Sequence, residues 1–173
     1  MSGDEGIVNK VAQSGLINLD LQSLRPNGVR YFIDIKEQLW QGIALKEKEF
    51  RSWVKEHDWN QYREGHVAVG CSEDAIIPSW AYMLIASKLQ GIAQTIIFGG
   101  LEQLETQLFK EAIRSMDMEA YEDGRVLVKG CGEGVPQSAY LYLTQRLQPT
   151  VKSLMFGEAC SSVPVYKAPR KPQ

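Results

Sequence analysis

Two apolar runs near the start of the chain alternate with polar positions at a period of two. They are LINLDL at 16–21 and VRYFIDI at 29–35, and the segment Arg-Pro-Asn-Gly separates them. Alternation at this period is typical of half-buried strands, and Pro, Asn and Gly favour a turn between strands. The pattern therefore predicts a β-hairpin, preceded by a short amphipathic helix within residues 1–15.

A helical period replaces the alternation in residues 46–62. Charged side chains cover most of this stretch, while a few apolar residues recur at helical spacing: Leu45, Phe50, Trp53 and Val54. One apolar stripe on a charged helix indicates a helix at the surface. We therefore interpret residues 1–62 as an N-terminal α+β extension of the same domain, made of a helix, a hairpin and a surface helix.

From His66 onward the chain contains an internal repeat. Matched residues lie 58 positions apart: Pro78 and Pro136, Ala81-Tyr82 and Ala139-Tyr140, Leu89 and Leu147, Phe98-Gly99 and Phe156-Gly157. Each repeat has a strand, a loop with a cysteine, a helix that begins at a proline, and a second strand that ends in Phe-Gly. A strand, a helix and a second strand in this order predict a βαβ unit with parallel strands.

The predicted fold class is α/β, with a parallel sheet built from two tandem βαβ repeats over residues 63–166. A helix over 101–116 would connect the repeats, so that four parallel strands share one sheet and the hairpin lies beside it. The segment 167–173 is basic and contains two prolines, which predicts a flexible tail.

Three cysteines follow predicted strands. Cys71 comes after the strand VAV, Cys131 after VLV, and Cys160 after SLMF. The carboxyl ends of parallel strands meet at one edge of a sheet, where α/β proteins form their sites. We therefore expect all three thiols at the same sheet edge, and Cys71 and Cys131 also precede helix N-termini, which favour a thiolate.

Three interpretations of these cysteines stay open. The first is a thiolate metal site for zinc, iron or an iron–sulfur cluster, with Asp74, Glu133 and Glu158 as candidate further ligands. The second is persulfide chemistry on Cys71 or Cys131. The third is a structural or interaction module with buried structural thiols, whose tryptophans pack a homodimer.

The first repeat bears some similarity to the catalytic half of a rhodanese. The similarity lies in Cys71 after a strand, a helix with Trp and Ala, and Gly99-Gly100 at the end of the next strand. A rhodanese loop is rich in Gly and Arg, whereas the loop here reads SEDAIIP. Its two carboxylates would destabilise a persulfide, so the resemblance implies at most a sulfurtransferase-like enzyme.

Histidine and aromatic residues give less indication of chemistry. His57 follows the surface helix and is interpreted as a helix cap or a solvated side chain. His66 opens the first strand of the repeat, at the edge opposite the cysteines, which argues against Cys-His catalysis. The tryptophans and tyrosines are expected to pack the core, and Tyr82 and Tyr140 are expected to play matched packing roles. No nucleophile is paired with a base, so we expect no self-sufficient catalysis.

Composition and charge exclude several classes of protein. Hydrophobic residues make up 44% of the 173 residues, the net charge is −2 and the pI is about 5.8, which fits an ordinary globular protein and disfavours nucleic-acid binding. The glycines of 130–134 match neither a P-loop nor a dinucleotide fingerprint, so no nucleotide is expected. No secretory signal and no apolar span is visible, which predicts a cytoplasmic protein, and an odd number of cysteines argues against a disulfide framework.

Four strings in the chain are distinctive: LWQGIALKEKEFRSWVKEHDW, CSEDAIIPSWAYMLIASKL, KGCGEGVPQSAY and LMFGEACSSVPVYK. Together they resemble the bacterial domain of unknown function family 2480 over nearly the whole chain, and the three cysteines stand in that family's motifs. The family has no assigned activity. The resemblance implies an association with iron–sulfur cluster assembly gene clusters, with iron–sulfur assembly proteins as partners, and so favours an accessory protein with a thiolate site.

Overall fold

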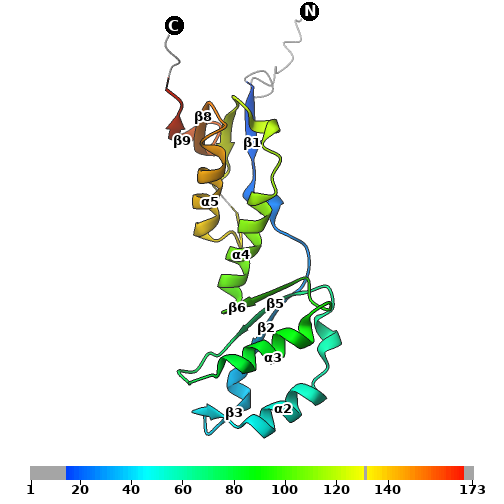
Figure 1. The fold of residues 1–173 in the computed structure, drawn as a ribbon. Helices are drawn as coiled ribbons and strands as arrows, with labels where there is room; N and C mark the ends of the chain where they lie inside the picture. Colours follow the sequence, from blue (N-terminus) through cyan, green and yellow to red (C-terminus); the bar gives the residue numbers. More distant parts are fainter. Residues whose placement is uncertain (1–14, 131, 170–173) are drawn as a thin grey trace, which may run out of the picture. The chain divides into compact units, whose positions relative to one another are not determined.

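The chain forms a mixed α/β structure, which confirms the predicted class (Figure 1). The computed structural model describes residues 15–130 and 132–169. The chain divides into two compact units: unit 1 comprises Met1–Arg25 and Phe109–Gln173, and unit 2 comprises Pro26–Leu108. Unit 2 is therefore inserted between two parts of unit 1, and the second division falls within helix α4 (Leu101–Arg114).

Unit 2 is built on a sheet of three parallel strands in the order β2-β5-β6. All five residues of the central strand, HVAVG, are buried, as expected for a parallel strand that is covered on both faces. Its elements are β2 (Arg30–Asp34), η2 (Ile35–Gln38), β3 (Leu39–Trp40), β4 (Ala44–Leu45), α2 (Glu47–Glu56), η3 (Trp59–Tyr62), β5 (His66–Gly70), α3 (Ser79–Leu89) and β6 (Thr95–Phe98).

Unit 1 has a sheet of four strands in the order β1-β7-β8-β9. The first three strands run parallel, and β9 pairs antiparallel with β8. The elements of unit 1, besides the second half of α4, are β1 (Leu16–Leu19), η1 (Leu21–Leu24), η4 (Glu119–Tyr121), β7 (Arg125–Val128), α5 (Gln137–Leu147), β8 (Ser153–Glu158) and β9 (Ser161–Lys167).

The two units resemble one another in their sheets and in one helix. Helices α3 and α5 both begin one residue after a proline and are buried along the same stripe: Ala81, Ile85 and Leu89 in α3, and Ala139, Leu143 and Leu147 in α5. Spacing of four residues places each trio on one helix face, which packs into the core of its own unit. The four-stranded sheet of unit 1 differs from the three-stranded sheet of unit 2 in having a further strand, β9, at its edge.

The first strands of the two sheets also correspond. Each is followed by a 3-10 helix whose N-cap is an aspartate: Asp20 accepts a hydrogen bond from the backbone N–H of Gln22, and Asp34 from that of Lys36. The next residue, Leu21 or Ile35, is almost completely buried. In both segments the capping side chain satisfies an N–H that the short helix leaves free, which stabilises the change from strand to 3-10 helix.

The predicted β-hairpin is wrong, although its strands exist. β1 pairs with β7, Leu16 lying opposite Arg125, and β2 pairs with β5, Arg30 lying opposite His66. The chain passes from unit 1 to unit 2 at Arg25, within the segment that was expected to form the turn. Alternation reports that one face of a strand is buried, but it does not identify the strand's partner.

The predicted single sheet of four parallel strands is also wrong. β5 and β6 belong to the sheet of unit 2, while β7 and β8 belong to the sheet of unit 1. Of the predicted helices, 101–116 agrees closely with α4, and 46–62 is divided into α2 and the short η3.

The ends of the chain limit two further predictions. The expected helix within 1–15 and the last residues of the expected tail lie outside the described residues. Lys167, the first residue of that tail, is instead the last residue of β9, and the backbone N–H of Ala168 donates to the Lys152 carbonyl. Of the helices that the structure describes, none is long and apolar enough to cross a membrane.

Candidate functional site

The structure places the predicted cysteine ligands in different parts of the molecule. Cys71 directly follows β5 in unit 2, whereas Cys160 lies in the turn between β8 and β9 in unit 1. Cys131 lies outside the described residues. The expectation that all three follow strands of one sheet is wrong, because β5 and β8 belong to different sheets. A regular spacing in the sequence shows that two segments are alike, but not that they share a sheet.

The three candidate carboxylate ligands are all exposed: Asp74, Glu133 and Glu158. Over residues 15–130 and 132–169, no group of three or more His, Cys, Asp and Glu side chains lies close enough together to hold a metal ion. Metal binding by these residues and Cys131 stays a prediction.

Cys71 lies half-buried beside the core of unit 2. Its neighbour on α3 is Tyr82, whose hydroxyl pKa is raised first by burial and second by the charge of the Cys71 thiolate. The residue after the cysteine, Ser72, donates its backbone N–H to the Asp34 carboxylate at 3.0 Å and its hydroxyl at 2.6 Å. The N–H that follows Cys71 is therefore already bonded to the Asp34 carboxylate.

Asp34 is held as a carboxylate by these bonds. Partial burial raises the pKa of Asp34, but the hydrogen bonds from Ser72 and Lys36, with the Lys36 charge, outweigh it and bring the pKa below its usual value. One carboxylate thus joins the end of β2 to the loop that follows β5.

His66 is a buried structural residue at the start of β5, 3% exposed. Its Nε2 lies 2.8 Å from the Asn27 carbonyl, and its Nδ1 lies 3.1 Å from the Thr95 hydroxyl. A carbonyl can only accept, so Nε2 donates to Asn27, and Nδ1 pairs with the Thr95 hydroxyl, which can donate or accept. The ring joins the segment before β2, the start of β5 and the start of β6.

His57 is the C-cap residue of α2, as one of its two interpretations predicts. Its ring lies among Trp53, Trp59 and Tyr62, and its Nε2 is 2.9 Å from the Tyr62 hydroxyl. Burial lowers the pKa of His57, and the nearby charge of Asp58 only partly offsets that effect. Most of the tryptophans pack into this core as expected, but Trp40 is 46% exposed, with the Lys46 ammonium 4.7 Å from its ring centroid.

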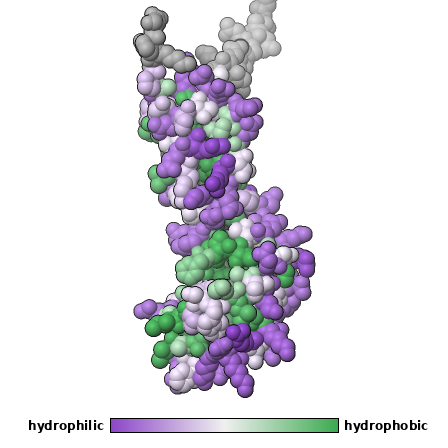
Figure 2. Space-filling model, viewed as in Figure 1, coloured by the Kyte–Doolittle hydropathy of each residue, from purple (hydrophilic) through white to green (hydrophobic). Residues whose placement is uncertain are grey.

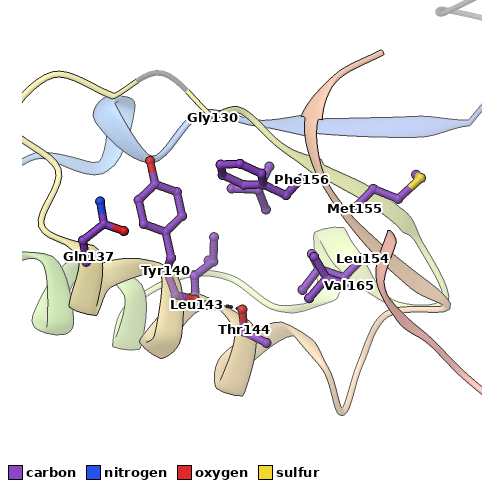
Figure 3. A pocket seen from close by; sticks show the side chains of 10 residues that line it. Gly130, Gln137, Tyr140, Leu143, Thr144, Leu154, Met155, Phe156 and Val165 are labelled. Carbon is purple, nitrogen blue, oxygen red and sulfur yellow. Dashed lines mark hydrogen bonds between the residues drawn. The ribbon is translucent and has the colours of Figure 1, made fainter. Parts of the chain in front are cut away.

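Unit 1 contains a pocket of about 300 Å³ between α5 and strands β7, β8 and β9 (Figure 3). The rings of Tyr140 and Phe156 meet edge to face at one side, with their centroids 5.7 Å apart. Gly130 makes this arrangement possible, because a β carbon there would lie 3.0 Å from Cζ of Phe156. Val165 of β9 closes another wall.

Among the residues that the structure describes, the lining of this pocket is mostly apolar and includes no Asp, Glu, His, Lys or Arg. Its polar groups include those of Gln137, Tyr140 and Thr144, and the Thr144 hydroxyl donates to the Tyr140 backbone carbonyl at 2.8 Å. Such a lining favours an uncharged occupant, since a charged group would lose its hydration without gaining an ionic partner.

Unit 2 has an equivalent pocket of about 290 Å³. Tyr82 and Phe98 meet edge to face there, with centroids 5.2 Å apart, at positions that correspond to Tyr140 and Phe156. The predicted matched packing of the two tyrosines is therefore confirmed. Within residues 15–130 and 132–169, no strand equivalent to β9 contributes to this second pocket.

Sequence reasoning found the tyrosines but missed the pockets. The repeated Phe-Gly at the strand ends was the available signal, since it places an aromatic ring 16 residues after each tyrosine. The glycine at 130 and the wall supplied by β9 depend on tertiary structure, and no pattern in the sequence pointed to them.

Comparison with known proteins identifies a family only. A family model described as a protein of unknown function (DUF2480) matches residues 5–168. No curated protein and no solved structure matches the chain.

Proposed function

The chain belongs to the DUF2480 family of proteins of unknown function, and we propose that it acts as an interaction module whose unit 1 pocket receives an uncharged, apolar side chain of a partner protein. The proposal keeps the interaction module of the third interpretation drawn from the sequence, but it places the contact at the pocket of unit 1 and not at the tryptophans, all four of which lie in unit 2. One observation carries the proposal: an apolar pocket opens within a rim of exposed apolar side chains.

The rim consists of residues on α5, β8 and β9. Leu141, next to Tyr140, is 66% exposed, and Val163 and Val165 of β9 are 62% and 50% exposed. Val163 lies opposite Phe156 in the sheet, and Phe156 lines the pocket. Exposed apolar side chains beside an apolar pocket are typical of protein–protein contact sites, where an anchor side chain fills a pocket at the centre.

The size and charge of the pocket indicate what it holds. A volume of about 300 Å³ is at the lower end of small-molecule sites, which fits one large aliphatic or aromatic side chain. The described residues of the lining include no Asp, Glu, His, Lys or Arg, which argues against a charged side chain. The expected partner segment therefore presents leucine, phenylalanine or a similar residue.

Amide chemical shifts of the full chain test this proposal. N-acetyl-leucine amide and N-acetyl-phenylalanine amide serve as side-chain probes, and N-acetyl-glutamate serves as the charged control. We expect the neutral probes to shift signals of α5, β7 and β8 around the pocket, and the glutamate not to do so. Neutral probes that leave those signals unmoved would refute the proposal.

Two substitutions on one strand provide a matched pair. Val165→Phe narrows the pocket, which Val165 lines, whereas Val163→Phe enlarges an exposed side chain on the same strand that does not line it. The proposal expects the probe shifts to be lost in the first variant and kept in the second. Equal loss in both would mean that the probes bind β9 rather than the pocket.

A thiolate site for zinc, iron or an iron–sulfur cluster remains a second proposal, supported by the resemblance of the cysteine motifs and by the position of Cys160 at the carboxyl end of β8. Metal and acid-labile sulfide measured in protein purified without oxygen test it. Losing one thiolate should collapse the site, so each variant Cys71→Ser, Cys131→Ser and Cys160→Ser should lose the metal. Full metal content in all three variants would exclude it.

Persulfide chemistry on Cys71 has weaker support. A persulfide anion needs N–H donors around it, and the N–H of Ser72 donates to Asp34 instead. If this chemistry occurs, one cysteine should be essential and the other two dispensable, which distinguishes it from a metal site.

A further inference from the structure

The sheet of unit 2 ends on an open edge. β6 pairs with β5 on one side, and no described strand pairs with its other side. The equivalent strand of unit 1, β8, is paired on both sides because β9 covers its outer edge. An antiparallel strand therefore covers the outer edge of β8 in unit 1, whereas no described strand covers the equivalent edge of β6 in unit 2.

The hydrogen-bond pattern shows which groups β6 presents at this edge. The N–H of Gly99 donates to the carbonyl of Val69 at 3.0 Å. Alternate residues of a parallel strand bond to the same neighbour, so Ile97 and Gly99 direct their backbone groups toward β5. Ile96 and Phe98 therefore direct their N–H and C=O groups outward, where an added strand would meet them.

The side chains around this edge are apolar and exposed. Phe98 is 75% exposed, and Met83 on α3 and Leu101 on α4 are 70% and 48% exposed. Figure 2 shows apolar surface over the part of unit 2 in which Figure 1 places β6 and the start of α4. Edge strands of native proteins usually avoid such a surface, because it recruits other strands.

Neither of two common protective devices is present on β6. The edge strand of unit 1, β9, contains Pro164 and a shift in register opposite Leu154 and Met155, both of which disfavour further pairing. The sequence of β6, Thr-Ile-Ile-Phe, contains no proline and no charge, and its pairing with β5 is regular. The edge strand β9 of unit 1 thus carries features that disfavour further pairing, and the edge strand β6 of unit 2 lacks them.

We propose that β6 pairs antiparallel with β6 of a second copy of the chain, so that two three-stranded sheets join into one sheet of six strands. Because β6 contains no charge and no proline, nothing in its sequence disfavours pairing with the same strand of a second copy. A strand of a different protein would have to compete with this pairing between copies. Antiparallel pairing of identical strands is two-fold symmetric, and it closes on a dimer instead of growing into a fibre.

The outward groups fix the register of this pair. Ile96 exchanges both backbone hydrogen bonds with Phe98 of the second copy, and Ile97 lies opposite Ile97 of the second copy at the two-fold axis. This register pairs the whole length of the strand. It also brings the exposed Phe98 rings, with Met83 and Leu101, next to apolar surface of the second copy.

Sedimentation equilibrium on the full chain and its variants tests the proposal. The wild-type chain should be a dimer, and Phe98→Pro should be a monomer, because proline removes an outward N–H that the bonds to β5 do not use. Phe98→Val keeps the N–H and loses the ring, so it should remain a dimer. A monomeric wild type would overturn the proposal, and so would loss of the dimer in both variants, which would assign it to the ring alone.

Disulfide trapping tests the register without relying on the proline variant. In a Cys160→Ser chain, Ile97→Cys should form a disulfide-linked dimer on mild oxidation, since residues in a non-hydrogen-bonded pair approach within disulfide reach. Ile96→Cys is the matched control, because it faces Phe98 of the second copy and not another thiol. Equal trapping of both variants, or trapping of neither, would overturn this pairing.

Discussion

Asp34 and Ser72 are joined by two hydrogen bonds, one from the Ser72 backbone N–H at 3.0 Å and one from its hydroxyl at 2.6 Å. The same carboxylate caps η2 through the N–H of Lys36. Three donors on one side chain make Asp34 the connection between the end of β2 and the loop that carries Cys71. Its counterpart in unit 1, Asp20, caps η1 by accepting a hydrogen bond from the backbone N–H of Gln22.

Removal of these carboxylates should therefore have unequal effects. Asp34→Ala should lower the free energy of unfolding of unit 2 by about 2–3 kcal/mol, and Asp20→Ala should lower that of unit 1 by about 1 kcal/mol, as for loss of a simple cap. All four tryptophans lie in unit 2, so urea unfolding followed by tryptophan fluorescence reports that unit, while circular dichroism reports both. Equal losses would show that the bonds to Ser72 contribute nothing.

Two equivalent glycines should not tolerate a side chain. Gly99 and Gly157 follow the phenylalanines of the repeat and have φ values of 125° and 120°, and a β carbon on Gly157 would lie 2.7 Å from the Ser161 carbonyl oxygen. Alanine at either position should destabilise its own unit by about 1–3 kcal/mol. Gly91, at φ 75° with no atom within 4 Å of a built β carbon, provides the control, and Gly91→Ala should have a smaller effect of about 1 kcal/mol.

The hydroxyl group of Thr95, which is hydrogen-bonded to His66, should contribute more to the stability of unit 2 than the methyl group of Thr95 does. Thr95→Val keeps the shape but leaves Nδ1 of the buried His66 without its hydrogen-bond partner, which should destabilise unit 2 by about 1–3 kcal/mol. Thr95→Ser keeps the hydroxyl and should retain most of the stability. Urea midpoints from tryptophan fluorescence compare the two, and a serine variant weaker than the valine variant would contradict the assigned role.

Local patterns in the sequence were enough to find several elements. A proline before each apolar helix and a spacing of 58 residues located α3 and α5, and the matched tyrosines pack as their positions predict. These features depend on neighbours within a few turns of helix or on equivalence between two segments. Helix starts and buried helix faces depend on residues close together in the sequence, so sequence patterns predict them.

Pairing between distant segments could not be recovered in the same way. β1 pairs with β7 across more than a hundred residues, because unit 2 is inserted between them, and alternation at a period of two says nothing about that partner. The error carried over to the candidate site: one assumed sheet brought Cys71 and Cys160 to one edge, and the actual sheets place them in different units. The pocket of unit 1 was missed because Gly130 and Val165, 35 residues apart in the sequence, come to line one pocket only in the folded state.

His57 should make the stability of unit 2 depend on pH. Burial among Trp53, Trp59 and Tyr62 lowers the pKa of His57 below its usual value of 6.5, so the unfolded chain binds a proton more readily than the folded one. Stability from the neutral ring is fully present above pH 6.5 and is lost as the pH falls from there through the folded-state pKa. The free energy of urea unfolding should be lower at about pH 5.5 than at about pH 7.5 in the wild type, and this difference should be smaller in His57→Gln. Glutamine keeps a polar group near the Tyr62 hydroxyl but cannot become charged. Because every other titrating group is the same in both chains, an identical pH dependence would mean that His57 does not titrate differently in the folded state.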